Sequence, residues 1–512
     1  MSDDEQANEK AAEVKPDHEP PAGAEVTATW TGGTEPIEYT ATAKWLVLRK
    51  KEKPAAEIFS VSYVASGGGD ERPVTFVFNG GPGASSAYLH VGAVGPQRVY
   101  FPPDGSLPPM PPRLVQNESS WLAFTDLVFV DPVGTGFSRV IEPDKTNNTA
   151  KGGDGKEPKK DEGATDPKEF FAQKRDLESL CEFMSRWLSE HRRWGSPIFI
   201  AGESYGGYRV GRLVRLLQEN AGIGLSGAIL ISPALEITPL SSTDYDVVGW
   251  IDTLPTMALA AVHHGRSRAF PAATAQEDVL AEVEAFAAGD FASFLASGDA
   301  MSTAERQRIL SRLAELVGLP LDFVVRAEGR IGIQTFAREL LRDERKVVGL
   351  YDATITVTDP FPDREAFTGP DPTLSGFTPA YTTAINRLLR SEIGVETDRE
   401  YALLSFEVFN AWKDDAEHHF FAPPVGATDD FRYGMALNPH MKAFITHGRF
   451  DLVTPYHASD RLRNLMRFDP QAAGRVTVRH FGGGHMFYAW ESSRHEFGEA
   501  IAAFVADATA TP

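Results

Sequence analysis

A serine between two glycines forms the segment with the clearest chemical pattern. Residues 202–206 read Gly-Glu-Ser-Tyr-Gly, an apolar run at 198–201 precedes them, and apolar residues at helical spacing follow over 206–217. A strand, a glycine-flanked serine and a helix together place a nucleophile on a tight turn, where the first N–H groups of the helix face a developing oxyanion. A chance match in a glycine-rich loop is the alternative, and the flanking strand and helix argue against it. The pattern therefore predicts Ser204 as a nucleophile.

Two later loops supply the partners that such a serine needs. A hydroxyl needs an imidazole to take its proton and a carboxylate to orient that imidazole. Asp451 follows an apolar strand at 442–446, and His485 follows a strand at 475–480 and three glycines. The chain order serine, aspartate, histidine is that of α/β-hydrolases. We therefore predict Ser204, Asp451 and His485 as a catalytic triad.

Other histidines and aspartates fit these roles less well. His480 belongs to the last predicted strand, where its side chain is committed to one sheet face. Asp460 lies in a predicted helix, and Asp131 precedes the nucleophile. The adjacent pairs at 263–264 and 418–419 do not direct two imidazoles at one metal ion from a helix or a strand. We expect no metal site.

Strands predicted on both sides of the serine define the fold class. They fall at 26–30, 37–43, 58–63, 74–78, 127–130, 198–201, 227–231, 442–446 and 475–480. Antiparallel strands at the start, followed by alternating strands and helices, predict an α/β-hydrolase fold with a mostly parallel central sheet flanked by helices.

The domain organisation follows from where this alternation stops. Residues 236–440 are mainly helical in pattern, with helices expected at 278–287, 303–316, 333–342 and 382–390. We interpret 236–440 as a helical cap insertion in a core of residues 26–235 and 441–512. The acidic, proline-containing residues 1–25 are expected to be a disordered tail, and the charged residues 145–168 a surface insertion.

Composition excludes several classes of function. Of 512 residues, 42% are hydrophobic and 24% charged, as in ordinary globular proteins, and the net charge of −21 argues against nucleic-acid binding. We expect no membrane span, because uncharged apolar runs of sufficient length are absent from the sequence. The single cysteine, Cys181, and the lack of a visible signal peptide favour a cytoplasmic protein. A start upstream of Met1 would leave a secreted or periplasmic location open.

Two further loops that follow predicted strands are rich in glycine. They read Asn79-Gly80-Gly81-Pro82-Gly83 and Asp131-Pro132-Val133-Gly134-Thr135-Gly136-Phe137-Ser138. The first is poor in bulky side chains, so its N–H groups can approach a substrate as an oxyanion hole or anion nest.

Together with Gly202-Glu203-Ser204-Tyr205-Gly206-Gly207 and Gly484-His485-Met486, these loops resemble the serine carboxypeptidase family (peptidase family S10). The resemblance runs from about Val74 to Met486 and implies serine-dependent removal of C-terminal residues from peptides, with no cofactor. It also implies that the N–H groups of Gly81 and Tyr205 form the oxyanion hole. Asn79 and Glu203 would bind the carboxylate of a free C-terminus.

The chain departs from the family pattern at three places. Ala84 stands where the family usually has a disulfide cysteine, and Ser232-Pro233-Ala234 replaces a sequence containing glycine and asparagine. In the family, a second glutamate pairs with the one that precedes the nucleophile, here Glu203. Ala93 occupies the position of that second glutamate, which weakens the expectation of exopeptidase specificity. We therefore keep three hypotheses: a serine carboxypeptidase acting through an acyl-enzyme, an esterase or acyltransferase on the same scaffold, and a catalytically silent binding protein.

Overall fold

The computed structural model describes residues 18–141, 166–240, 242–364, 367, 369–413 and 426–510. Most of the predicted tail, nearly all of the predicted insertion at 145–168 and the histidine pair at 418–419 lie outside these residues. The first strand begins at Ala24, two residues before the strand expected from the sequence.

The centre of the described chain is a ten-stranded sheet, ordered β1-β2-β3-β7-β4-β9-β10-β13-β14 with β8 paired to β3. Its strands are β1 (Ala24–Trp30), β2 (Ile37–Lys50), β3 (Lys53–Ala65), β4 (Val74–Phe78), β7 (Asp126–Val130), β8 (Arg139–Val140), β9 (Ile198–Glu203), β10 (Gly227–Ile231), β13 (Lys442–Thr446) and β14 (Val476–Val478). The first three strands and β7 pair antiparallel, and the strands from β7 to β14 are parallel. The predicted fold class is confirmed.

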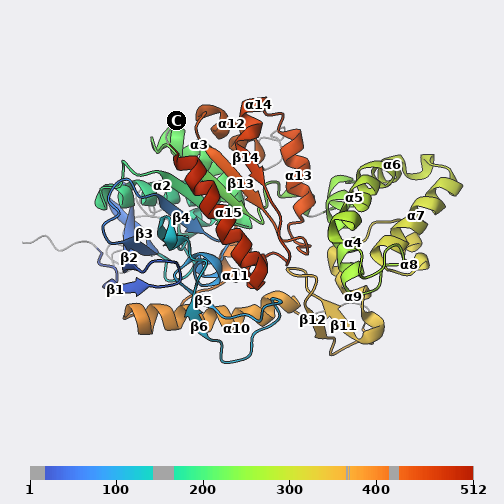
Figure 1. Ribbon diagram of the computed structural model, residues 1–512, viewed down its shortest axis with the longest axis horizontal. Helices are drawn as coiled ribbons and strands as arrows, with labels where there is room; N and C mark the ends of the chain where they lie inside the picture. The colour runs from blue at the N-terminus through green and yellow to red at the C-terminus, as the bar shows by residue number, and fades with distance from the viewer. Residues whose placement is uncertain are drawn as a thin grey trace, which may run out of the picture.

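Both faces of the sheet are buried under helices, as continuous apolar strands require. Along β9, Ile198 and Ile200 pack with helices α2 (Gln173–Glu190), α3 (Tyr205–Asn220) and α12 (Thr428–Leu437). The alternate residues Phe199 and Ala201 belong to the opposite core with α10 (Pro372–Arg387) and α15 (Glu491–Thr509). In Figure 1, α15 crosses the sheet as a long red helix and α10 runs below the core in orange.

The first six α-helices after β10 form a lobe beside the sheet, at the right of Figure 1. They are α4 (Val248–His263), α5 (Gln276–Phe286), α6 (Ala292–Ser297), α7 (Thr303–Val317), α8 (Leu321–Arg326) and α9 (Ile333–Glu339). Their apolar faces share one core, which also includes Phe450 and Leu452 from the loop that carries Asp451 and Tyr456 from the start of the next helix. The lobe therefore packs on the chain around a predicted triad residue. The exact division at 236 and 440 stays a prediction.

The insertion differs from the expected helical pattern at two points. Strands β11 (Lys346–Val348) and β12 (Thr356–Thr358) pair antiparallel after α9. Helix α10 begins at Pro372, ten residues before the expected helix, because the Asp371 side chain accepts the Leu374 N–H and Pro372 suits the first helical turn. The prolines that suggested a break in the sequence are thus part of a helix start.

Several other elements, besides further short 3-10 and π-helices, complete the described chain. They are α1 (Ala87–Leu89), the one-turn π-helix η1 (His90–Val94), β5 (Gln97–Val99), β6 (Leu114–Gln116), α11 (Phe406–Ala411), α13 (Tyr456–Leu465) and α14 (Pro470–Gly474). Within the described ranges, the chain has no helix that is both long and apolar enough to cross a bilayer.

Candidate active site

Ser204 occupies a strained turn between β9 and α3. Strand β9 ends at Glu203, α3 begins at Tyr205, and Ser204 between them has φ 62° and ψ −122°. Positive φ is costly for a residue with a side chain and persists only where the surroundings impose it. A Cβ added at Gly202 would lie 2.2 Å from the Gly206 carbonyl oxygen, so the turn can close only with glycine there. The local geometry is that of a nucleophile elbow.

His485 and Asp451 form a buried pair. His485 Nδ1 lies 2.6 Å from Asp451 Oδ2. The other carboxylate oxygen accepts the N–H groups of Val453 and Thr454 at 2.8 and 3.0 Å, and the Thr454 hydroxyl donates to Oδ2 at 2.7 Å. Burial alone would lower the pKa of His485, but the charge and hydrogen bond of Asp451, with the charge of Glu203, raise it above 6.5. Asp451 thus stabilises the charged form of the imidazole.

Ser204 and His485 meet at one cavity of about 60 Å³, called the site cavity below. Its lining residues are Asn79, Gly80, Gly81, Ala84, Tyr88, Glu203, Ser204, Tyr351, Leu374, Leu404, His485 and Met486. His480 pairs with Asp460 at 3.0 Å, and neither belongs to this lining set of described residues. The chain therefore holds a second Asp–His pair, set apart from the serine.

The Asn-Gly-Gly-Pro-Gly loop lies directly against the elbow. A Cβ on Gly80 would come within 2.4 Å of the Tyr205 nitrogen, so glycine is needed for this approach. Gly81 lines the site cavity, and the N–H of Tyr205 is the first of α3, a position without an intrahelical acceptor. Arg209 also anchors this loop, because its Nη1 donates a hydrogen bond to the Asn79 carbonyl at 2.7 Å.

Glu203 is a buried carboxyl group in the wall of the site cavity. Asn79 Nδ2 donates to Glu203 Oε2, and the Asn79 oxygen accepts the Leu89 N–H at 3.0 Å, which fixes the amide orientation. The Tyr488 hydroxyl lies 3.0 Å from each oxygen of Glu203. Burial raises the pKa of Glu203 to about 7, although His485, Tyr488 and Asn79 each lower it. The group therefore exchanges its proton near neutrality.

Two of the three departures from the family pattern contact this site. Ala84 lines the cavity and pairs through its backbone with Leu404. Ser232 Oγ donates to the His485 carbonyl at 2.8 Å, and the Ala234 N–H donates to the Ser204 carbonyl at 3.1 Å. Ala93 is 2% exposed in η1, and the described lining of the site cavity does not include it.

A larger cavity of about 390 Å³ lies between the core and the lobe. Pro233 and Ala234, beside the serine, contribute to its wall, as does Thr454, beside the Asp451–His485 pair. Much of the rest is apolar, including Leu235, Trp250, Ile331, Ile333, Leu452, Val453 and Leu462. Asp252 and Arg461 also line this cavity, where they form an ion pair with two hydrogen bonds of 2.7 and 2.8 Å.

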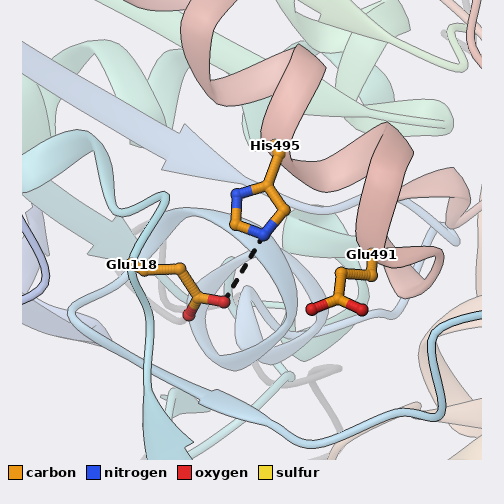
Figure 2. Close-up of side chains that lie close together, drawn as sticks. All are labelled: Glu118, Glu491 and His495. Atoms are coloured by element: carbon orange, nitrogen blue, oxygen red, sulfur yellow. Dashed lines mark ion pairs between the residues drawn. The ribbon is translucent and has the colours of Figure 1, made fainter.

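One group of possible metal ligands occurs among the described residues, formed by Glu118, Glu491 and His495. Figure 2 shows the three side chains converging from α15 and a neighbouring loop, with His495 Nε2 3.6 Å from Glu118 Oε1. Glu118, however, accepts hydrogen bonds from Arg98 and Arg494 at 3.1 and 3.2 Å. Burial raises its pKa, but a backbone hydrogen bond and the two arginines lower it to about 2. Ion pairs with Arg98, Arg494 and His495 account for the placement of Glu118.

Sequence reasoning missed Thr454, Tyr488 and Tyr351 as parts of the site. Thr454 is three residues after Asp451 and could have been suspected as a side chain that caps the carboxylate. Tyr488 follows the Gly-His-Met segment but carries no local signal for Glu203, which lies 285 residues away in sequence. Tyr351 comes from the insertion, whose fold the helical pattern did not resolve.

Comparisons with known proteins agree with the motifs. The family model for serine carboxypeptidases matches residues 40–260, a segment that contains both the Asn-Gly-Gly-Pro-Gly loop and Ser204. This part of the chain matches the serine carboxypeptidase family. The predicted resemblance is confirmed, while Asp451 and His485 lie outside the matched residues.

Curated relatives align over a limited part of the chain. Serine carboxypeptidase-like 13 of Arabidopsis thaliana is 31% identical over 170 residues, 32% of this chain and 33% of that protein. The pheromone-processing carboxypeptidase KEX1 of Saccharomyces cerevisiae is 33% identical over 148 residues, 28% of this chain and 16% of that protein. The chain thus spans a third or less of the length of these curated relatives.

The solved structure of KEX1(delta)p, a prohormone-processing carboxypeptidase from Saccharomyces cerevisiae, shares the fold. It matches with a TM-score of 0.52 over 92% of this chain and 92% of that chain, at 15% sequence identity.

Proposed function

We propose that this chain is a serine-type carboxypeptidase that hydrolyses C-terminal residues of peptides through an acyl-enzyme. One observation carries the proposal: Ser204 and the Asp451-paired His485 line the same cavity as Glu203 and Asn79. Nucleophile, base and a protonatable carboxyl group thus face one small space. The family match over residues 40–260 and relatives with carboxypeptidase names support the same reaction.

The proposed chemistry follows from the roles of these groups. Asp451 engages His485 Nδ1, so Nε2 is the nitrogen that takes the proton as Ser204 Oγ attacks the scissile carbonyl. The N–H groups of Gly81 and Tyr205 stabilise the oxyanion. His485 then gives its proton to the leaving amino group as the C–N bond breaks. Water, deprotonated by His485, attacks the acyl-enzyme and releases Ser204.

Recognition of a free C-terminus is assigned to Glu203, Asn79 and Tyr488. A protonated Glu203 donates a hydrogen bond to the substrate carboxylate, whereas an ionised one repels it. Tyr488 contacts Glu203, and the family's second glutamate is missing, because position 93 is alanine. One protonatable carboxyl group and a tyrosine hydroxyl therefore replace a glutamate pair.

We assign the acyl part of the substrate to the 390 Å³ cavity. The leaving residue occupies the site cavity on the carboxylate side, so the residue before the scissile bond must extend to the other side of Ser204. Pro233 and Ala234 connect the serine to that larger, mainly apolar space. A bulky apolar side chain fits such a wall best.

An esterase or acyltransferase is the second candidate, favoured by Ala93 alone. The same triad would form the same acyl-enzyme. Weaker binding of a free carboxylate would matter less for such an enzyme, because an ester substrate need not carry one.

Hydrolysis of a blocked dipeptide acid and its C-terminal amide separates these proposals. A carboxypeptidase cleaves the acid with a kcat/KM at least about 10-fold above that of the amide near pH 7, the size of one charge-assisted hydrogen bond. Equal rates for both, with faster cleavage of a matched ester, would favour the esterase.

A further inference from the structure

A short segment of the insertion, residues 350–353, lies between the two loops that carry the histidine and the aspartate. It connects β11 with β12. On one side, the Leu350 carbonyl accepts the Leu452 N–H and the Ala353 N–H donates to the Phe450 carbonyl, each at 3.0 Å. These two bonds flank Asp451 in sequence. The segment therefore extends the Asp451 loop by backbone pairing.

On its other side, the same segment binds the His485 loop. The Tyr351 carbonyl accepts the His485 N–H at 2.5 Å, and the Tyr351 ring stands edge-on to the imidazole with 5.1 Å between centroids. Asp352 Oδ2 accepts the Gly484 N–H at 3.0 Å. Two successive N–H groups, those of Gly484 and His485, thus end on residues of the insertion.

The two oxygens of Asp352 have separate partners. Oδ1 accepts the N–H and hydroxyl of Thr354 at 2.9 and 2.6 Å, which fixes the carboxylate within its own turn. Oδ2 is left for Gly484 and for the Trp490 indole N–H, at 3.0 and 3.3 Å. Burial raises the pKa of Asp352 to about 6, so the group is ionised at neutral pH and both oxygens accept.

Gly484 and Asp352 pack closely against each other. A Cβ added at Gly484 would lie 2.4 Å from Asp352 Cα and 2.5 Å from its Cβ. Asp352 is 4% exposed, and neither of the two cavities described above includes it in its lining. Its effect on the reaction must therefore pass through the loop that it holds.

We propose that Asp352 is a positioning residue for His485: its carboxylate orients the Gly483–Gly484 peptide, directly before the histidine, so that the insertion completes the triad geometry. The inference rests on the proposed function of Ser204, Asp451 and His485. Catalytic geometry tolerates little error, since a displacement of about 1 Å can reduce the rate about 100-fold.

The direct test is Asp352→Asn. The amide keeps the shape of the carboxylate, but it turns an NH2 group either to Gly484 or to Thr354, where another donor already points. We expect kcat for a peptide acid to fall by about 10- to 100-fold, with KM changed by less than about 2-fold. The rate of labelling of Ser204 by a fluorophosphonate should fall in parallel, because it depends on the same imidazole.

Asp359→Asn is the matched control. Asp359 is also a buried aspartate near β12, where it pairs with Arg338 and accepts the Phe361 N–H at 2.9 Å. Arg338 and Phe361 lie in the insertion and not in the triad loops. Its loss should lower the melting temperature and leave kcat within about 2-fold of wild type.

Two milder variants keep the test decisive if Asp352→Asn does not fold. Thr354→Ala frees Oδ1 to rotate, and Trp490→Phe removes one donor to Oδ2; each should lower kcat by about 3-fold at unchanged KM. An Asp352→Asn enzyme as active as the Asp359→Asn control, or a change confined to KM, would overturn the role of Asp352. If Asp352→Asn does not fold, unchanged kcat in both milder variants would overturn it. Absence of fluorophosphonate labelling in the wild-type chain would instead refute the proposed function itself.

Discussion

The Tyr488 hydroxyl lies 3.0 Å from both carboxyl oxygens of Glu203. This contact places a neutral donor against the group that we assign to the substrate carboxylate. Because Glu203 is 2% exposed and its pKa is raised to about 7, its protonation state changes near neutral pH. The pH dependence of substrate binding should therefore report on this one carboxyl group.

The first prediction is a bell-shaped pH profile for peptide acids. His485 must be neutral to act as a base, and its pKa is raised above 6.5, so kcat/KM should rise with pH through that range. Above about pH 7 Glu203 ionises and repels the substrate carboxylate, so kcat/KM should fall again. Peptide amides should show only the rising limb. Profiles of identical shape for the acid and the amide would remove Glu203 from carboxylate recognition.

Glu203→Gln gives a sharper version of the same test. A glutamine cannot ionise and still offers an N–H donor to the substrate. The falling limb for peptide acids should disappear in this variant, while the rising limb remains. A falling limb that persists in Glu203→Gln must belong to another group.

The second prediction concerns Tyr488→Phe. The hydroxyl lowers the pKa of Glu203, so its removal should move the falling limb of the peptide-acid profile to higher pH. We expect KM for peptide acids to change by about 2- to 10-fold, the size of one hydrogen bond, with amides little affected. Tyr401→Phe is the control, because Tyr401 is a buried tyrosine whose hydroxyl donates to Asp131 at 3.2 Å. Equal effects of both variants would indicate a loss of packing alone.

The third prediction compares the two Asp–His pairs. His485→Ala should reduce kcat by about 10⁴-fold or more, and Asp451→Asn by about 10⁴-fold at most through the wrong imidazole tautomer. His480 and Asp460 form the other pair, at 3.0 Å, and neither belongs to the described lining of the site cavity. His480→Ala and Asp460→Asn should therefore leave kcat within about 10-fold of the wild-type value. Steady-state kinetics on folded variants decides between the pairs. The reverse ranking would show that His480 is the base.

The fourth prediction concerns stability. Arg209 is 1% exposed and binds Asp176 through two hydrogen bonds, at 2.7 and 3.2 Å. Arg209→Ala would leave the Asp176 charge buried without its partner, so the free energy of unfolding should fall by about 3–5 kcal/mol. Arg186→Ala, which removes a surface ion pair with Glu182 and an exposed hydrogen bond to the Val47 carbonyl, should change it by less than about 1 kcal/mol. Urea unfolding of both variants measures the difference.

The strands and the elbow could be predicted because their signals are local. The apolar runs at 74–78, 227–231 and 442–446 match β4, β10 and β13, since a strand buried on both faces must be apolar throughout. Ser204, Asp451 and His485 could be singled out because each follows a strand in a recognisable loop. Their catalytic roles stay predictions.

The contacts around these residues could not be predicted, because they join distant parts of the chain. Asp352 lies 132 residues before Gly484, in a segment that joins two short strands within a helical pattern. Arg209 sits at helical spacing among apolar residues and gave no sign that it would be buried against Asp176. These contacts depend on how the insertion and α2 pack on the rest of the chain. The spacing of apolar residues predicts helices and strands, but it does not predict such packing.

The most direct test of the account is covalent labelling of the serine. Wild-type protein is treated with a fluorophosphonate at pH 8, and the modified residue is located by peptide mass spectrometry. We expect one adduct, on Ser204, which is absent in folded Ser204→Ala and formed at least about 10³-fold more slowly in His485→Ala. A folded wild-type protein that remains unlabelled, or an adduct on another serine that persists in Ser204→Ala, would contradict the account.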